Sequence, residues 1–176
     1  MLILGIDPGL TTAGIGLIDA TNRHHPTAVD WLTITTNPAL PLAERLRELR
    51  DDLDAYLKDV HPEKAVVEQL FFATNKQTAM ATAQARGVIL ATLAGHGIAV
   101  QKVTPLQLKT AITGDGKSDK RQMQEMVKRI LKLKELPSPA DAADALALAL
   151  YGAFTLHVSE PASPSRPRQT TRKLPR

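Results

Sequence analysis

The chain has 176 residues, of which 43% are hydrophobic, and it contains no cysteine. This length suits one domain with a single core. The lack of cysteine excludes disulfides, thiolate metal sites and a cysteine nucleophile. The longest apolar segment, residues 145–154, falls well short of the roughly 20 residues that a membrane-spanning helix needs. The N-terminus also lacks the features of a secretion signal. We therefore expect a cytoplasmic protein without a membrane partner.

The net charge of +4 is distributed unevenly along the chain. Residues 101–134 contain nine Lys or Arg and three Asp or Glu, and residues 159–176 contain five and one. Concentrated positive charge attracts polyanions such as nucleic acid. A solvated helix face has the same composition, so charge alone favours a nucleic-acid partner only weakly.

Three segments near the N-terminus predict β-strands. Residues 2–6 form an apolar run that stops at the Asp-Pro-Gly turn of residues 7–9. Residues 12–18 form a second strand despite two glycines, and residues 29–35 alternate in polarity and are rich in β-branched side chains. The short gaps between these strands predict an antiparallel meander.

The remainder of the chain predicts helices that alternate with strands. This order indicates an α/β domain over residues 1–157, with a five-stranded mixed sheet and helices on both faces. Residues 158–176 are rich in Pro, Ser and basic side chains and are expected to be a disordered tail. The predicted elements are a helix over residues 41–60, a strand over 65–67 closed by Glu68, a helix over 75–94 capped by Asn75, a strand over 98–103, a short helix from Pro105 to Gly114, a basic helix over 118–134, and a last helix capped by Ser138 with Pro139 as its first residue.

Four carboxylates occupy strand ends and the start of the last helix. Asp7 closes the first strand and Glu68 closes the fourth. Asp141 and Asp144 share one helix face, because residues three apart lie on the same side. Sites in open sheets collect outside the carboxyl ends of strands. If the first and fourth strands are neighbours and the last helix packs over them, the four carboxylates converge.

Carboxylates that converge need positive charge to stay ionised. Oxygen-only ligand sets select hard cations such as Mg²⁺ or Mn²⁺. Two such ions about 4 Å apart clamp the attacking and leaving oxygens of a displacement at phosphorus, which predicts phosphodiester hydrolysis with two ions per active site. Taken singly, Asp7 could start a turn, Glu68 could be an exposed strand end, and Asp141 could complete a capping box with Ser138. These simpler explanations do not predict convergence.

Four motifs occur in an order and spacing that resemble the RuvC family, the bacterial Holliday-junction resolvases. They are GIDPG at residues 5–9, VEQLF at 67–71, QARG at 84–87 and PADAADALALA at 139–149. The resemblance covers about residues 1–155. It implies an RNase H-like fold and a homodimeric, metal-dependent endonuclease. Such an enzyme makes paired symmetric nicks in four-way DNA junctions during recombination and repair. It also implies the branch-migration proteins RuvA and RuvB as partners.

The resemblance assigns roles to particular residues of this chain. It places the catalytic, metal-binding tetrad on Asp7, Glu68, Asp141 and Asp144, the junction-facing aromatic on Phe71, and DNA contacts on Lys109 and Lys120. Departures from the family pattern are minor. The pair at residues 11–12 is Thr-Thr where a more polar pair is common, which leaves the contacts of that turn open.

The residues themselves add further candidates for DNA contact. Lys117 and Arg121 lie beside a turn with glycines at 114 and 116, a basic loop suited to phosphate contacts, although Arg121 could equally be a solvated helix residue. An aromatic side chain at Phe71 could stack on a base or belong to the core. The Ala-rich helix over 75–94 is equally a candidate dimer interface and a core helix. Gly87 within it would allow another backbone to approach.

Three alternatives compete with the nuclease hypothesis. Residues 111–118, AITGDGKS, resemble a P-loop, but the first glycine is missing and a helix is predicted before them. Residues 5–16 also resemble the first phosphate loop of actin-like ATPases and sugar kinases, which need two such domains and therefore a longer chain. A non-catalytic junction-binding module would gain nothing from four carboxylates beside a phosphate.

Overall fold

The computed structural model describes residues 1–22, 24–69 and 76–155. Its centre is one sheet with the strand order β3-β2-β1-β4-β5. The first three strands form an antiparallel meander, whereas β4 and β5 run parallel to β1. The first and fourth strands are therefore neighbours, which meets the condition for convergence of the carboxylates. The strands are β1 Leu2–Asp7, β2 Thr12–Asp19, β3 Thr27–Thr35, β4 Lys64–Glu68 and β5 Ala99–Val103.

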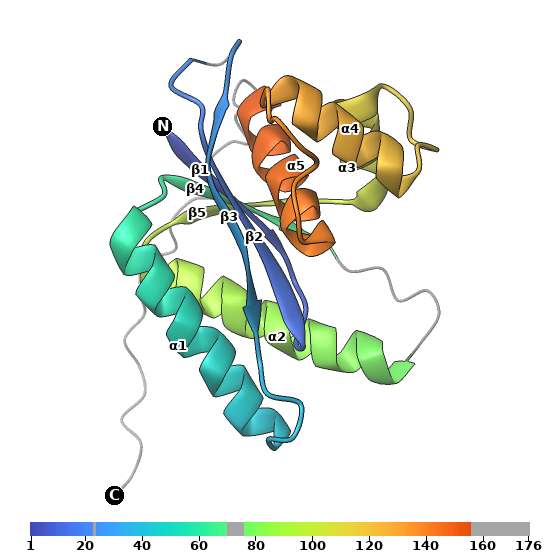
Figure 1. Cartoon of the computed structure of the whole chain (residues 1–176). Coiled ribbons are helices and arrows are strands. Elements are labelled where there is room, and N and C mark those ends of the chain that lie inside the picture. The colour runs from blue at the N-terminus through green and yellow to red at the C-terminus, as the bar shows by residue number, and fades with distance from the viewer. Residues whose placement is uncertain (23, 70–75, 156–176) are drawn as a thin grey trace, which may run out of the picture.

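Helices cover both faces of the sheet, as predicted (Figure 1). On one face lie α1 (Leu42–Val60) and α2 (Lys76–Gly95), and on the other lie α3 (Pro105–Thr113), α4 (Lys120–Ile130) and α5 (Ala140–Phe154). Within the described part of the chain, no helix combines the length and the apolar character needed to cross a membrane.

Strand alternation produces one apolar core on each side of the sheet. Successive side chains of a strand point to opposite faces. In β1, Leu4 and Ile6 pack in the core beneath α1 and α2, whereas Ile3 packs in the core beneath α5. Asp7 follows Ile3 by four residues and therefore faces α5. Glu68 follows Val66, another residue of the α5 core, by two residues and faces the same side.

A row of glycines lets α5 lie directly on the sheet. A Cβ at Gly5 would overlap the carbonyl oxygen of Ala145, and a Cβ at Gly14 would overlap that of Asp141. A Cβ at Gly16 would lie 2.5 Å from the backbone nitrogen of residue 146. The two glycines that interrupt the pattern of β2 thus have a packing role: they allow the backbone of the helix to touch the strands.

One local expectation is wrong. The N-cap of α5 is Pro139 and not Ser138, and no side chain caps this helix, so Asp141 takes part in no capping box there. The simpler explanation for Asp141 therefore fails, and its carboxylate is free for other contacts. Gly87 has open space around it within the described chain, so the approach of another backbone to it stays a prediction. By contrast, α4 begins with a capping box in which Asp119 and Gln122 exchange hydrogen bonds.

Some predictions fall outside the described residues. Phe71 and Asn75 lie in the gap between residues 69 and 76, and the predicted tail over 158–176 follows the last described residue. The boundary between the domain and the tail stays a prediction.

Candidate active site

Three carboxylates from two distant parts of the chain meet at one edge of the sheet. Asp7, Asp141 and Asp144 each offer an oxygen, and these oxygens lie within 4.8 Å of one another. Asp7 ends the central strand β1, and the close packing of α5 on Gly14 brings Asp141 to the same place. The predicted convergence is thus observed for these three residues.

Glu68 belongs to the same site but is not a member of this group of three. It ends β4, the parallel neighbour of β1, and lines a cavity of about 180 Å³ together with Asp7 and Asp144. Its oxygens are not within the 4.8 Å that joins the other three carboxylates. The complete lining of this acidic cavity is Asp7, Glu68, Pro105, Leu108, Lys109, Lys120, Met123, Asp144 and Leu148.

Burial and like charge disfavour the ionised form of the carboxylates in the cavity. Burial, followed by the charges of Glu68, Asp144 and Asp141, raises the pKa of Asp7 to about 7. Burial and the charge of Asp144 also raise the pKa of Glu68. The cluster therefore holds a proton near neutral pH unless positive charge enters. An all-oxygen donor set of this kind fits a hard divalent cation.

Lysines approach the carboxylates from α3 and α4. The Lys120 Nζ lies 2.8 Å from Asp144 Oδ2, and the hydrogen bond between them raises the pKa of Lys120. The charge of Lys120 lowers the pKa of both Asp7 and Glu68, against the larger effect of burial. Lys109 lines the same cavity. Both lysines that the family resemblance selected therefore lie where a phosphate entering the cavity would meet them.

The end of β4 is anchored by an arginine from α2. Arg86 Nε donates a hydrogen bond to the backbone carbonyl oxygen of Glu68 at 3.0 Å. The next residue, Gln69, donates its N–H to the carbonyl oxygen of Val103 at 2.7 Å. These bonds fix the backbone that carries the Glu68 carboxylate. Arg86 belongs to the QARG motif, which was the available signal, but the sequence did not indicate its role.

A second arginine fastens the turn that follows Asp7. Arg45 of α1 donates to Thr11 Oγ1 at 2.9 Å and to Thr36 Oγ1 at 3.0 Å. Thr36 in turn donates its hydroxyl to the carbonyl oxygen of Leu10 at 2.6 Å. The turn contacts that the Thr-Thr pair left open in the sequence are therefore partly internal, with Thr11 accepting a hydrogen bond from Arg45.

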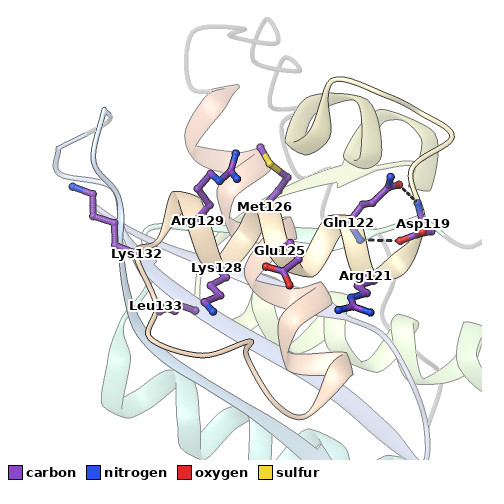
Figure 2. A pocket seen from close by; sticks show the side chains of 9 residues that line it. All are labelled: Asp119, Arg121, Gln122, Glu125, Met126, Lys128, Arg129, Lys132 and Leu133. Carbon is purple, nitrogen blue, oxygen red and sulfur yellow. Dashed lines mark hydrogen bonds between the residues drawn. The ribbon is translucent and has the colours of Figure 1, made fainter.

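Lys117 and Arg121 do not line the acidic cavity. Lys117 is exposed in the turn between α3 and α4, where its N–H donates to Asp115 Oδ1 at 2.9 Å. Arg121 is exposed on α4 and lines a different groove, shown in Figure 2. The P-loop alternative fails as expected, because residues 111–118 begin within helix α3 and do not follow a strand.

A mixed sheet in this order, with carboxylates from its two central parallel strands and from a helix packed across it, defines the RNase H-like class of nucleases. The family model described as "Crossover junction endodeoxyribonuclease RuvC" matches residues 3–151. The chain belongs to the RuvC family. The resemblance carried by the four motifs is thereby confirmed, and membership implies a divalent-metal nuclease, in agreement with the acidic cluster.

Individual relatives span nearly the whole domain. The crossover junction endodeoxyribonuclease RuvC of Desulfitobacterium hafniense is 45% identical over 159 residues, which cover 90% of this chain and 95% of the relative. That of Chloroflexus aurantiacus is 46% identical over 155 residues, which cover 88% and 94%. The structure described as T. thermophilus RuvC in complex with Holliday junction substrate superimposes with a TM-score of 0.82 at 34% identity, and covers 88% of this chain and 93% of that one.

Proposed function

We propose that this protein resolves four-way DNA junctions by metal-dependent hydrolysis of phosphodiester bonds. As a homodimer it makes paired symmetric nicks in recombination and repair. The observation that carries this proposal is the meeting of Asp7, Asp141 and Asp144 at one edge of the sheet, in a chain that belongs to the RuvC family. A module that only bound junctions would have no use for a cluster of carboxylates that repels phosphate.

Asp7, Glu68, Asp141 and Asp144 would hold the metal. Mg²⁺ or Mn²⁺ suits these oxygen ligands, and we propose two ions per active site. When bound, the ions supply positive charge to the attacking and leaving oxygens of the displacement. The carboxylates also keep the site open to cations, since their mutual repulsion disfavours the metal-free, fully ionised state.

The other residues of the cavity position the DNA. Lys120 and Lys109 bind the phosphate that enters, and Lys120 exchanges its contact with Asp144 for one with the phosphate. Leu108, Met123 and Leu148 form an apolar wall that excludes water and strengthens the electrostatic contacts inside. Outside the cavity, we place Phe71 against the bases of the junction, and Lys117 and Arg121 on flanking phosphates.

Two symmetric nicks require two sites related by a two-fold axis. We propose the outward side of α2 as the subunit interface. Its inward side is occupied, since Ala85, Ile89 and Leu93 are buried in the core, whereas Met80 is 66% exposed. A cytoplasmic location and the branch-migration proteins RuvA and RuvB as partners are proposed from family membership alone.

The decisive experiment compares a synthetic four-way junction with a linear duplex of the same sequence. We expect Mg²⁺ or Mn²⁺ to support paired cuts in opposing strands of the junction, and EDTA to abolish them. Junction binding without any cutting would favour a binding module. Equal cutting of the linear duplex would contradict selectivity for junctions, and appreciable ATP hydrolysis without DNA would revive the ATPase alternatives.

A further inference from the structure

A second, larger groove lies on the outer side of α4 and shares no residue with the acidic cavity. It encloses about 600 Å³. Figure 2 shows Arg121, Glu125 and Lys128 on one side of the helix, and Met126 and Arg129 on the other. The opposite face of α4 is buried in the core through Met123 and Val127. Apart from Arg121, which the proposed function places on a flanking phosphate, this outer face has no role in the site described above.

The charge of the groove is mainly positive. Arg121, Lys128, Arg129 and Lys132 contribute four cations, against the carboxylates of Asp119 and Glu125. The Asp119 carboxylate is already engaged, because its Oδ1 accepts the N–H of Gln122 at 2.8 Å. Among the described residues, none of the four cations is paired with a carboxylate. Their charge is therefore available to an anionic partner.

The cations are spaced along the helix axis. With a rise of about 1.5 Å per residue, the distance along the axis from Arg121 to Lys132 is about 16 Å. Lys128, Arg129 and Lys132 lie close together at the C-terminal end of α4, and Arg121 lies about 10 Å before Lys128 along the axis, so together they span the length of several phosphates of a DNA strand. Lys120 begins the same helix and lies in the acidic cavity, so a strand that enters the cavity meets the row at its first member.

Lys132 stands in a backbone conformation that glycine normally takes. Its φ is 53°, in the left-handed region. Lys132 donates its N–H to the carbonyl oxygen of Arg129 at 3.3 Å, and Leu133 donates to that of Lys128 at 2.9 Å. This pair of bonds is the Schellman ending of a helix, in which glycine is the preferred residue at this position. A lysine here costs stability and places a fourth cation at the end of the groove.

We propose that this groove, lined by Arg121, Lys128, Arg129 and Lys132, binds the phosphate backbone of a junction arm next to the strand held in the acidic cavity. The inference rests on the proposed function and adds to it a contact surface remote from the carboxylates. An acidic protein segment would suit the charges too. The groove is assigned to DNA because α4 runs directly from the acidic cavity into it.

Lys132→Gly provides the sharpest test, because the substitution removes the cation and relieves the backbone. We expect this variant to unfold at a higher temperature than the wild type and yet to bind a four-way junction about threefold more weakly in EDTA. The slope of log affinity against log salt, which is negative, should become less steep by about 0.9, the effect of one lost phosphate contact. His61→Gly is the matched control. His61 has a φ of 48° at the end of α1, and its replacement should raise stability without changing DNA binding.

Two further variants extend the test. The double variant Lys128→Gln/Arg129→Gln should make the slope of log affinity against log salt less steep by about twice as much. Arg47→Gln on α1 should leave this slope unchanged. Glu125→Gln should tighten junction binding. Wild-type affinity and slope in Lys132→Gly and in the double variant would overturn the inference, as would an acidic peptide that binds the groove while junction DNA does not compete. If the wild type fails to cut junctions at all, it is the proposed function that fails.

Discussion

The ammonium group of Lys120 lies 2.8 Å from the carboxylate of Asp144, so helices α4 and α5 meet through an ion pair inside the acidic cavity. Lys120 thereby supplies part of the positive charge that the cluster of carboxylates needs. A divalent cation or a DNA phosphate entering the cavity changes this balance, because the first competes with the lysine and the second attracts it.

Asp7→Asn should abolish cutting while preserving binding. The substitution removes one charged ligand from the centre of the cluster, so we expect the rate of junction cleavage to fall by about a hundredfold or more. Junction affinity should not weaken, since a negative charge near phosphate is lost. Initial cleavage rates and gel-shift titrations measure the two effects, with Asp59→Asn on the exposed side of α1 as control. Wild-type cutting by Asp7→Asn would remove this residue from the mechanism.

The metal-free protein should lose stability as the pH rises. The pKa of Asp7 is about 7 in the folded protein and near 3.8 in the unfolded chain, so the folded state binds the proton more tightly. Its contribution to stability is fully present below about pH 4 and is lost as the pH rises toward 7. In EDTA at pH 8, Asp7→Asn should therefore be more stable than the wild type by about 2 kcal/mol, allowing for partial solvent screening. Denaturant unfolding at several pH values tests this, and a pH-independent difference would contradict it.

Lys109→Ala and Lys120→Ala should each weaken DNA binding and reduce its dependence on salt. Every lost phosphate contact makes the negative slope of log affinity against log salt less steep by about 0.9. Lys58→Ala is the control, since Lys58 pairs with Asp54 at 2.6 Å on α1. A slope equal to that of the wild type would show that neither cavity lysine touches a phosphate.

Gly14→Ala should disturb the metal site through the backbone. The added Cβ overlaps the carbonyl oxygen of Asp141, so α5 must move away from β2. We expect a loss of about 1 to 3 kcal/mol in the free energy of unfolding and weaker Mn²⁺ binding, measured by calorimetry. Gly95→Ala has open space and should be neutral or slightly stabilising. Unchanged Mn²⁺ affinity in a folded Gly14→Ala protein would contradict the role given to this glycine.

Removal of the chain after Val158 should leave metal-dependent cleavage intact. The basic residues of this segment would add sequence-independent affinity for DNA at most, through counterion release. Cleavage rates of the shortened and full chains on the same junction test this prediction. Loss of activity would show that the segment belongs to the catalytic domain.

The sequence was most informative where a local pattern determines the outcome. An apolar run that stops at an Asp-Pro-Gly turn placed Asp7 at a strand end, and the spacing of Asp141 and Asp144 placed both on one helix face. Their meeting depends on the packing of α5 against β1 and β2, which no local pattern encodes. The sequence registered Gly14 only as an interruption of a strand, because its purpose lies in a helix more than a hundred residues away.

Contacts to backbone atoms were also beyond the sequence. Arg86 donates a hydrogen bond to the backbone carbonyl oxygen of Glu68. Every residue has such an oxygen, so the side-chain pattern of the sequence does not predict this contact. The left-handed conformation of Lys132 was also not predictable, because this conformation is typical of glycine and not of lysine. At Ser138 the local pattern predicted a cap that the structure does not have, because α5 begins at Ala140 with Pro139 as its N-cap.

The glycines beneath α5 have one more consequence. At these glycines the backbone of α5 contacts the backbone of the strands directly. The distance between the backbone of Asp7 and the backbones of Asp141 and Asp144 is therefore set by main-chain contact. Side chains can change rotamer and adjust to a neighbour, but main-chain atoms in regular structure have no such freedom. The distance between the backbones that carry these carboxylates is therefore fixed by main-chain contact, and repacking of the surrounding core cannot increase or decrease it.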